Sequence, residues 1–214
     1  MEYVIVGACI AAAGAVEGIR SVDRHGPITV IDGEKQGSYS RPLISYYLTD
    51  PGRYSSPVYR DDGFFTRYGA MLVKAQARKI DRERRQIILD DGKTVDYDRL
   101  LLATGASPVI PDIAGARQDW VKTFYTLADA RELDQTVRAG QKAVVIGSGL
   151  IGMKAAEALH KRGLQVTVLE REPHILPRTM SASAAAFVAG RLQEAGLGFI
   201  CHREIREITV NHEI

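Results

Sequence analysis

The sequence contains few of the residues that mark several classes of protein. Its 214 residues include two cysteines and one tryptophan, and the charge is almost balanced at +2. Two cysteines cannot form the disulfide framework of a small secreted domain, and their scarcity is typical of a reducing compartment. The small charge surplus gives no electrostatic reason to expect nucleic acid or a membrane surface as a partner.

Long apolar runs and a basic leader are also absent. No stretch approaches the roughly 20 apolar residues of a membrane span, and Met1 to Gly7 pass directly into a strand-like run. The composition is that of an ordinary globule, with 45% hydrophobic and 25% charged residues. We therefore expect a cytoplasmic protein of one or two domains with a sizeable core.

The N-terminal part predicts a β–α–β unit. An apolar run from Tyr3 to Val6 ends at Gly7, and a helix of small residues is expected over about Ile10 to Arg20. A second apolar run, Ile28 to Ile31, ends in Asp32. Strand, glycine turn, helix, strand and acid in this order are typical of a nucleotide-binding unit.

A different pattern follows this unit. Residues Ser38 to Tyr54 are rich in Ser, Tyr, Pro and Arg and are expected to begin as a loop over the sheet. Further on, the runs Gln86 to Leu89 and Lys93 to Tyr97 flank an Asp-Asp-Gly turn, which is a strong hairpin signal. We expect a β-meander here, followed by a buried strand from Leu100 to Ala103.

The first pattern then begins again. A strand is expected over Lys142 to Ile146, a helix over Ile151 to Lys161 and a strand over Gln165 to Leu169, which ends in Glu170. A further helix (Ser181 to Ala195) and strand (Gly198 to Cys201) follow. The chain therefore carries an internal repeat of a nucleotide-binding unit.

The second copy is shorter than the first. Gly105 follows Gly7 by 98 residues, and a second copy of that length from Gly147 would need a chain of about 245 residues. We therefore predict an α/β fold of two consecutive Rossmann-like units with a β-meander insertion, over residues 1–110 and 111–214. We expect the second unit to be incomplete.

Each glycine turn predicts an anion site, because the first N–H groups of the following helix are unsatisfied and lie at its positive end. The second copy has all three glycines, Gly147, Gly149 and Gly152, and Glu170 lies 23 residues after the first. A carboxylate there would bind the ribose hydroxyls and repel a 2′-phosphate, which favours NAD(H) over NADP(H).

The first copy departs from this pattern. Gly7 is followed by Cys9 at the second position and Ala12 at the third, and Asp32 lies 25 residues on. Alanine is tolerated at the third position, but a side chain at the second stands where a pyrophosphate should approach. Cys9 is either a small residue tolerated in the loop or a thiol activated at a helix N-terminus.

These motifs together resemble the FAD- and NAD(P)-dependent pyridine nucleotide–disulfide oxidoreductase superfamily. Within it, the chain is most similar to the NADH:rubredoxin reductase and nitrite-reductase-like flavoproteins. Four segments, whose order and spacing cover nearly the whole chain, carry the resemblance: Tyr3 to Ala8, Ser40 to Leu48, Leu102 to Pro108 and Val145 to Gly152.

The resemblance implies FAD on residues 1–110 and NAD(H) on residues 111–214. Hydride would pass from NAD(P)H to the flavin and on to an electron acceptor, either a rubredoxin-like protein or a small molecule. The residues implied around FAD are Gly7, Ala8, Cys9, Ala11 and Ala12 at the pyrophosphate, Asp32 at the ribose, Arg41 and Pro42 beside the flavin, Ala77 at the adenine, and Ala103, Thr104 and Gly105 in the turn beside the cofactor. Those implied around NAD(H) are Gly147, Gly149, Leu150, Ile151, Gly152 and Glu170.

Two departures from the family pattern bear on mechanism. Disulfide reductases of the family carry a redox cysteine where this chain has Arg41 to Ser45, so a redox-active disulfide is not expected. Many relatives pair a lysine near the flavin with a glutamate after the second glycine motif, and Tyr46 and Lys154 stand at these positions. We hypothesise that Lys154 supplies the catalytic cation, the alternative being an exposed helix lysine.

The sequence also bears on functions other than a flavin enzyme. The histidines show no metal-ligand spacing, so no metal site is expected. The alternative to an enzyme is a non-catalytic nucleotide-binding or electron-transfer accessory subunit that has lost tight flavin binding at Cys9. A partner chain or a second copy could also complete the short second unit.

Overall fold

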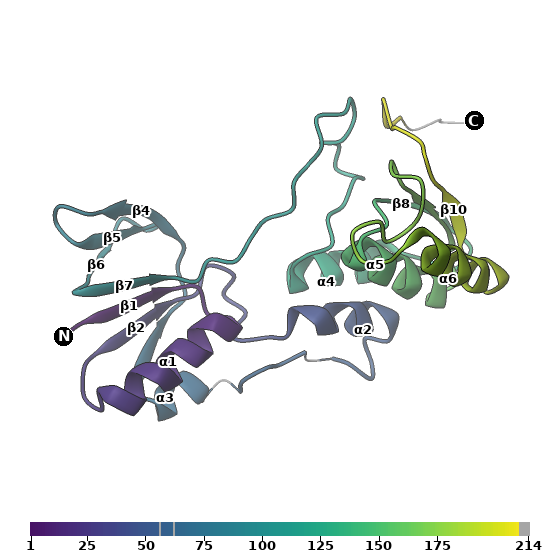
Figure 1. Ribbon diagram of the computed structural model, residues 1–214. Helices are drawn as coiled ribbons and strands as arrows, with labels where there is room; N and C mark the ends of the chain where they lie inside the picture. The colour runs from purple at the N-terminus through teal and green to yellow at the C-terminus, as the bar shows by residue number, and fades with distance from the viewer. Residues whose placement is uncertain (56, 62, 210–214) are drawn as a thin grey trace. The chain divides into compact units, whose positions relative to one another are not determined.

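The computed structural model describes residues 1–55, 57–61 and 63–209. The chain forms two compact units, one from Met1–Ser40 and Ser56–Ala106 and the other from Arg41–Ser55 and Ser107–Ile214. Each unit contains a parallel β-sheet with helices against it (Figure 1). The predicted α/β class with two Rossmann-like units is therefore confirmed, and the segment 41–55 folds with the second unit.

The sheet of the first unit has four parallel strands in the order β3-β2-β1-β7. The predicted strands β1 (Tyr3–Val6) and β2 (Ile28–Ile31) are confirmed, and β7 (Arg99–Leu102) begins one residue earlier than expected. The sequence did not identify β3 (Ala70–Val73) as a member of this sheet. Its four residues are too few to separate a buried strand from its neighbours.

Helices cover one face of this sheet. They are α1 (Ile10–Val22) and the short α3 (Phe64–Arg67). Ile5 of β1 and Val30 of β2 are buried with the small residues of α1 and with Phe64. The small side chains that the sequence placed in the first helix therefore allow close helix–strand packing.

A β-meander covers the opposite face (Figure 1). It consists of β4 (Ala77–Asp81), β5 (Gln86–Leu89) and β6 (Thr94–Asp96), which pair antiparallel in sequence order. Ile87 and Leu89 of β5 pack against Val4 and Val6 of β1. The predicted hairpin and meander are confirmed.

The sheet of the second unit has three parallel strands in the order β10-β9-β8. They are β8 (Lys142–Ile146), β9 (Gln165–Leu169) and β10 (Gly198–Ile200), close to the predicted runs. The predicted helices are α5 (Leu150–Lys161) and α6 (Ala182–Glu194).

Two further helices pack in the second unit, and neither was foreseen. They are α2 (Ile44–Thr49), which follows a 3₁₀ turn η1 (Arg41–Leu43), and α4 (Leu127–Thr136). Leu48 of α2 is fully buried in the core of this unit. The Arg162 guanidinium donates to the carbonyl of Leu48 at 3.1 Å and to the Asp134 carboxylate at 2.6 Å, which joins α2 and α4 to the end of α5.

The two sheets differ in how their equivalent strands are covered. Val4 and Val6 of β1 are 2% and 8% exposed, whereas Val144 and Ile146, at the same places before the second glycine turn, are 62% and 45% exposed. Among the described residues, no strand pairs with the outer edge of β8 and no meander covers this face. In the part of the chain that the structure describes, the face of β8 that carries Val144 and Ile146 is therefore exposed.

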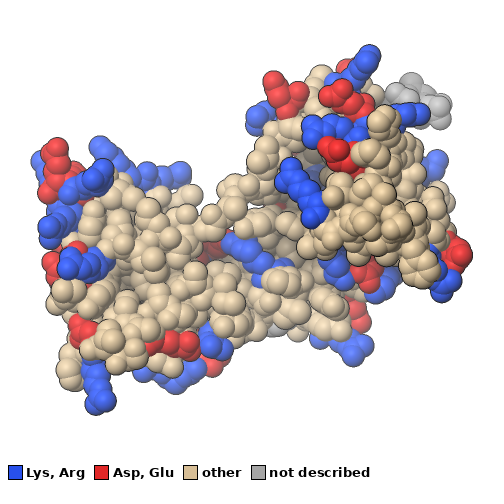
Figure 2. Space-filling view, viewed as in Figure 1, with Lys and Arg blue, Asp and Glu red and all other residues tan. Residues whose placement is uncertain are grey.

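The surface carries both signs of charge. On the face drawn in Figure 2, lysine and arginine are interspersed with aspartate and glutamate. Within residues 1–55, 57–61 and 63–209, the helices are too short or too polar to cross a membrane.

Packing demands glycine at position 152. A Cβ atom there would lie 2.0 Å from the carbonyl oxygen of Gly147, so the first turn of α5 lies directly on the preceding loop. We expect Gly152→Ala to lower the free energy of unfolding by about 1–3 kcal/mol, because this contact cannot relax without moving the helix.

The control for this variant is Gly190→Ala in α6. A Cβ on Gly190 meets nothing within 4 Å, so alanine should raise the free energy of unfolding by about 0.5–1 kcal/mol through lower chain entropy. Urea unfolding of both variants measures the difference. Equal stability of the Gly152→Ala variant and the unmodified chain would contradict the close approach.

Candidate functional site

Two glycine loops lie at the carboxyl ends of parallel strands, where open α/β sheets bind ligands. The first loop follows β1, and Gly7 has φ +114°. The second follows β8, and Gly147 has φ +92°. Both glycines therefore occupy backbone conformations that a side chain would strain.

The second position of each loop has the same backbone conformation. Cys9 has φ −90° and ψ −158°, and Gly149 has φ −66° and ψ 173°. Both are extended and open to any residue, so Cys9 does not distort the first loop. A glycine here serves to leave space for a ligand. The Cys9 thiol donates to the carbonyl of Tyr39 at 3.2 Å.

The helices that follow the loops have open N-termini. Side chains cap α4, through Thr126 and Asp129, and α6, through Ser181. Among the side chains that the structure describes, none caps α1 or α5. Their first-turn N–H groups are therefore available to an anion at the helix end. The residues that carry these groups include the predicted ligand-binding positions Ala11, Ala12, Leu150, Ile151 and Gly152.

The acid of the first unit, Asp32, is hydrogen-bonded to the loop that follows it. Asp32 is buried, and its carboxylate accepts hydrogen bonds from the backbone N–H groups of Lys35 at 3.0 Å and Gly37 at 2.8 Å. These bonds fold the loop after β2 around the carboxylate. Each carboxylate oxygen keeps a further lone pair for a ligand hydroxyl.

The acid of the second unit is bonded to the glycine loop itself. One oxygen of Glu170 accepts from the N–H of Ser148 at 2.8 Å and from its hydroxyl at 2.5 Å, and the other accepts from the N–H of Glu172 at 2.9 Å. Burial tends to raise the pKa of Glu170, but these hydrogen bonds outweigh it and lower the pKa. The link between Ser148 and Glu170 was not identified from the sequence.

The remaining residues predicted in the first unit gather near Gly7. Ala103 follows β7, and a Cβ on Gly7 would lie 2.2 Å from its carbonyl oxygen. The N–H of Ala103 bonds to the carbonyl of Val6 at 2.8 Å. Thr104 and Gly105 continue this turn, and Ala8 is buried beneath the loop. Ala77 begins β4 of the meander.

Arg41 and Pro42 lie in η1, within the second unit. The Arg41 guanidinium donates to the carbonyl of Tyr125 at 3.2 Å and lies over the ring of that tyrosine, 4.5 Å from its centroid. The predicted FAD residues are therefore divided between the units: Arg41 and Pro42 belong to the second unit, and the others belong to the first.

Lys154 is held on the surface of α5 by an acid and a ring. Its ammonium lies 2.5 Å from the Glu157 carboxylate and 4.9 Å from the ring centroid of Tyr46. Glu157 also pairs with Lys161 at 2.6 Å, and hydrogen bonds from the two lysines lower the pKa of Glu157. The i,i+3 and i,i+4 spacings could have indicated these pairs, but the Tyr46 contact depends on the fold.

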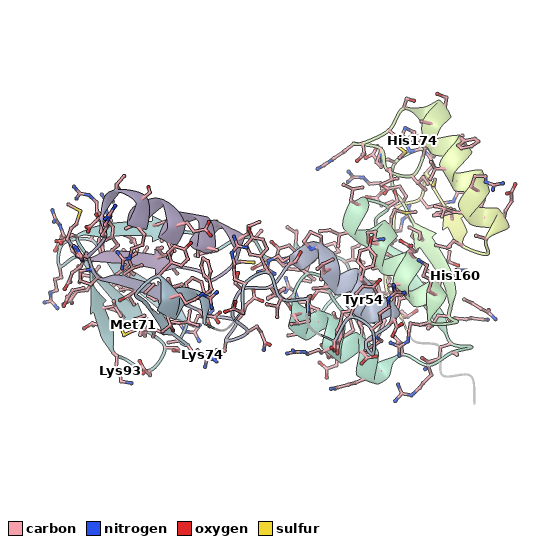
Figure 3. All side chains as sticks on the ribbon, turned by 90° about the horizontal axis from the view of Figure 1, so that it is seen from below. Tyr54, Met71, Lys74, Lys93, His160 and His174 are labelled. Atoms are coloured by element: carbon pink, nitrogen blue, oxygen red, sulfur yellow. The ribbon has the colours of Figure 1, made fainter. Side chains whose placement is uncertain are left out.

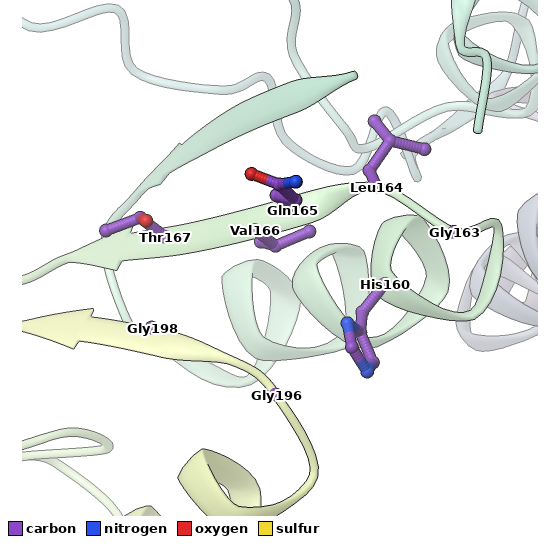
Figure 4. A pocket seen from close by; sticks show the side chains of 8 residues that line it. All are labelled: His160, Gly163, Leu164, Gln165, Val166, Thr167, Gly196 and Gly198. Carbon is purple, nitrogen blue, oxygen red and sulfur yellow. The ribbon is translucent and has the colours of Figure 1, made fainter. Parts of the chain in front are cut away.

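A cavity of about 540 Å³ lies at the other end of the second sheet (Figure 4). Its lining includes His160 near the end of α5, the start of β9 and the start of β10. The Nδ1 atom of His160 is buried and has no hydrogen-bond partner among the described residues. This end is opposite the glycine loop, so the cavity is separate from the nucleotide site that the loop predicts.

Cysteine and metal chemistry have little support. Cys9 and Cys201 are both free. Burial and the nearby Glu170 carboxylate raise the pKa of Cys201, which makes its thiol less reactive at neutral pH. Among the residues that the structure describes, no group of three His, Cys, Asp or Glu side chains could hold a metal ion.

Curated proteins and solved structures resemble this chain along most of its length. It is 36% identical over 196 residues to the NADH-dependent phenylglyoxylate dehydrogenase subunit epsilon of Aromatoleum evansii, covering 91% of this chain and 47% of the relative. It is 30% identical over 210 residues to the rubredoxin-NAD(+) reductase of Pseudomonas putida, covering 97% and 54%. A ferredoxin reductase structure from Rhodopseudomonas palustris matches with a TM-score of 0.91 at 30% identity, covering 99% and 53%.

The chain spans about half the length of these relatives. The family model described as pyridine nucleotide-disulphide oxidoreductase matches residues 1–214. This match confirms the resemblance read from the four sequence segments. The chain, glycine loops and buried acids included, belongs to the pyridine nucleotide-disulphide oxidoreductase family.

Proposed function

We propose that the chain is the nucleotide-binding part of an FAD-dependent NAD(P)H oxidoreductase. The observation that carries this proposal is the pair of uncapped glycine loops, each followed by a buried acid. A single loop of this kind would indicate one nucleotide, whereas two in one chain of this family support a flavin and a nicotinamide cofactor. FAD, when bound, supplies the chemistry of accepting hydride and passing electrons on.

The first unit offers a cradle that fits FAD. Gly7 and the first turn of α1 would hold the pyrophosphate by backbone N–H groups, and Asp32 would hold the ribose. Ala77 and the turn from Ala103 to Gly105 would flank the cofactor. Arg41 and Pro42, which the family resemblance implies beside the flavin, fold with the second unit. Support comes from the open helix end and the buried carboxylate.

The second unit offers a cradle for NAD(H). Gly147, Gly149 and the first turn of α5 would hold the pyrophosphate, and Glu170 would hold the ribose hydroxyls. The hydrogen bonds that lower the pKa of Glu170 keep this acid ionised at neutral pH. A charged carboxylate disfavours the 2′-phosphate of NADP(H) by repulsion, so we propose NADH as the donor.

The acceptor is proposed to be a small electron-carrier protein or a small molecule. Two relatives are named as reductases of rubredoxin and of ferredoxin. The proposed route uses no redox disulfide in the segment 41–45, because neither Cys9 nor Cys201 lies there.

A second candidate function is an accessory subunit that transfers electrons or binds a nucleotide without catalysis. Two observations favour it: Cys9 occupies space beside the proposed pyrophosphate site, and one relative is named as a dehydrogenase subunit. The bare edge of β8 also supports a partner chain or a second copy that completes the second sheet.

Binding of FAD tests the proposal against the accessory reading. We expect the chain to take up FAD and to show the flavin absorption band near about 450 nm. Cys9→Gly should lower the dissociation constant severalfold, because it clears the pyrophosphate approach. Cys9→Ser keeps the side-chain size and serves as the control. A protein that stays colourless with FAD in all three forms would favour the accessory function.

Glu170 should set the preference between the nicotinamide cofactors. We expect Glu170→Gln to weaken NADH binding about tenfold through loss of charged hydrogen bonds, and to reduce the discrimination against NADPH. Titration calorimetry with each cofactor measures both constants. The control is Glu172→Gln, since that neighbouring carboxylate pairs with Arg171. An unchanged ratio of the two constants would argue against the ribose assignment.

Lys154 should accelerate reduction of the flavin. A cation beside the flavin would stabilise the negative charge that hydride transfer places there. We expect Lys154→Met to slow flavin reduction by NADH about tenfold or more in stopped-flow measurements, and Lys154→Arg to restore part of the rate. Lys122→Met removes another paired lysine of this unit and is the control. A Lys154→Met variant with an unchanged rate would contradict the role.

A further inference from the structure

A groove of about 230 Å³ lies between α5 and the segment formed by α2 and its following turn, within the second unit. Three residues of α5 line one wall: Lys154, Glu157 and Lys161. Their spacing of three and then four residues puts them on one helix face. The other wall includes Tyr46 of α2 and the turn residues Arg53 and Tyr54, and Figure 3 shows Tyr54 beside these helices.

The walls of the groove are rigidly joined. Leu48, between the lining residues of α2 and the turn, is fully buried in the core. The side chain of Arg162, which follows Lys161, donates a hydrogen bond to the carbonyl of Leu48. The groove is therefore part of the packed helices rather than a gap between loose side chains.

The rings of Tyr46 and Tyr54 lie next to each other, between the cations of Lys154 and Arg53. The Lys154 ammonium lies 4.9 Å from the ring centroid of Tyr46, which lies 5.5 Å from that of Tyr54. The Arg53 guanidinium lies 5.5 Å from the Tyr54 centroid. This arrangement holds the two cations at separate points of the groove, each against an aromatic face.

Hydrogen-bond donors outnumber acceptors in this groove. Its lining contains three basic side chains and two acidic ones. Glu157 accepts from both lysines, but each ammonium has three N–H groups, so donors remain on both. Within the described part of the chain, neither the Tyr46 nor the Tyr54 hydroxyl has a hydrogen-bond partner. The Asp50 carboxylate also lines the groove and accepts from the backbone N–H of Arg53 at 3.1 Å. With three basic and two acidic side chains, the lining keeps a net positive charge and free donors.

We propose that this groove binds a small oxyanion, a phosphate or a carboxylate group, through Lys161, Arg53 and the two tyrosine hydroxyls, with Lys154 at its edge. Its volume of about 230 Å³ is several times the space that one water molecule needs, so such a group can enter. Lys161 lies about 16 Å along α5 from Leu150, at a rise of about 1.5 Å per residue. The Lys161 end of the groove is therefore distinct from the glycine loop, and only Lys154, at the edge, is shared with the proposed flavin chemistry.

Binding of inorganic phosphate to the 214-residue chain tests this site. Equilibrium dialysis is done without FAD or NADH, at an ionic strength held constant with chloride. We expect Lys161→Met and Arg53→Met each to weaken phosphate binding about tenfold, because each removes a charge-assisted hydrogen bond. Arg53→Lys, which keeps the charge, should lose less, and Tyr54→Phe should weaken binding severalfold.

Lys122→Met, which removes a paired lysine outside the groove, is the matched control and should bind phosphate like the unmodified chain. Thermal unfolding without phosphate identifies any variant that fails to fold, and the Arg53→Lys and Tyr54→Phe variants then carry the test. Equal phosphate affinity in the unmodified chain and all folded groove variants would overturn the proposal, because binding would then be non-specific.

The source of the oxyanion is resolved by competition. Dialysis with succinate in place of phosphate compares the dissociation constants of a carboxylate and a phosphate. Tighter binding of either anion supports the site if the groove variants weaken it. Phosphate binding is then repeated with saturating FAD and with saturating NADH. We expect phosphate to bind in both cases. Its displacement by either nucleotide would assign the groove to the phosphates of that cofactor and overturn an independent site.

Discussion

A backbone contact too close for a Cβ atom, at the end of the first strand, is the constraint on which both nucleotide loops depend. In the second unit the first turn of α5 lies against the carbonyl of Gly147, leaving no room for a Cβ atom on Gly152. In the first unit the tight contact is instead between Gly7 and Ala103, and Ala12 fits at the third position. The two loops thus present open helix N–H groups through different tight contacts.

The acid that follows the second strand of each glycine-loop repeat also differs between the two units in its hydrogen-bond partners. Glu170 bonds back to Ser148 in the glycine loop, whereas Asp32 bonds forward to Lys35 and Gly37. A ligand on the second unit therefore meets a carboxylate already fixed to the loop that would hold its pyrophosphate. A ligand on the first unit meets a carboxylate that organises its own loop, so the two halves of that site are less directly linked.

Much of the fold could be predicted from the sequence because buried parallel strands are short apolar runs that end in a glycine or an acid. This signal placed β1, β2, β8 and β9 at their observed bounds. It could not place α2, since six residues are too few to show a helical period. The capping box of α4, formed by Thr126 and Asp129, was a local signal that could have been recognised.

The candidate site was predictable where residues act through the backbone and much less so where they act through distant side chains. Glycines and helix starts are local, so the loops followed from spacing alone. The contacts of Lys154 with Tyr46 and of Arg41 with Tyr125 join residues 108 and 84 positions apart. Such contacts depend on the segment 41–55 folding with the second unit, which no local pattern in that segment indicates.

The same segment contributes to the core of the second unit. Burying a leucine side chain contributes about 1.5–3 kcal/mol, and Leu48 of α2 is fully buried in this core. Arg162 joins α2, α4 and the end of α5 through its hydrogen bonds to Leu48 and Asp134. The helices that stabilise this unit are therefore also those that shape the cationic groove, so the groove is a direct consequence of how the second unit is held together.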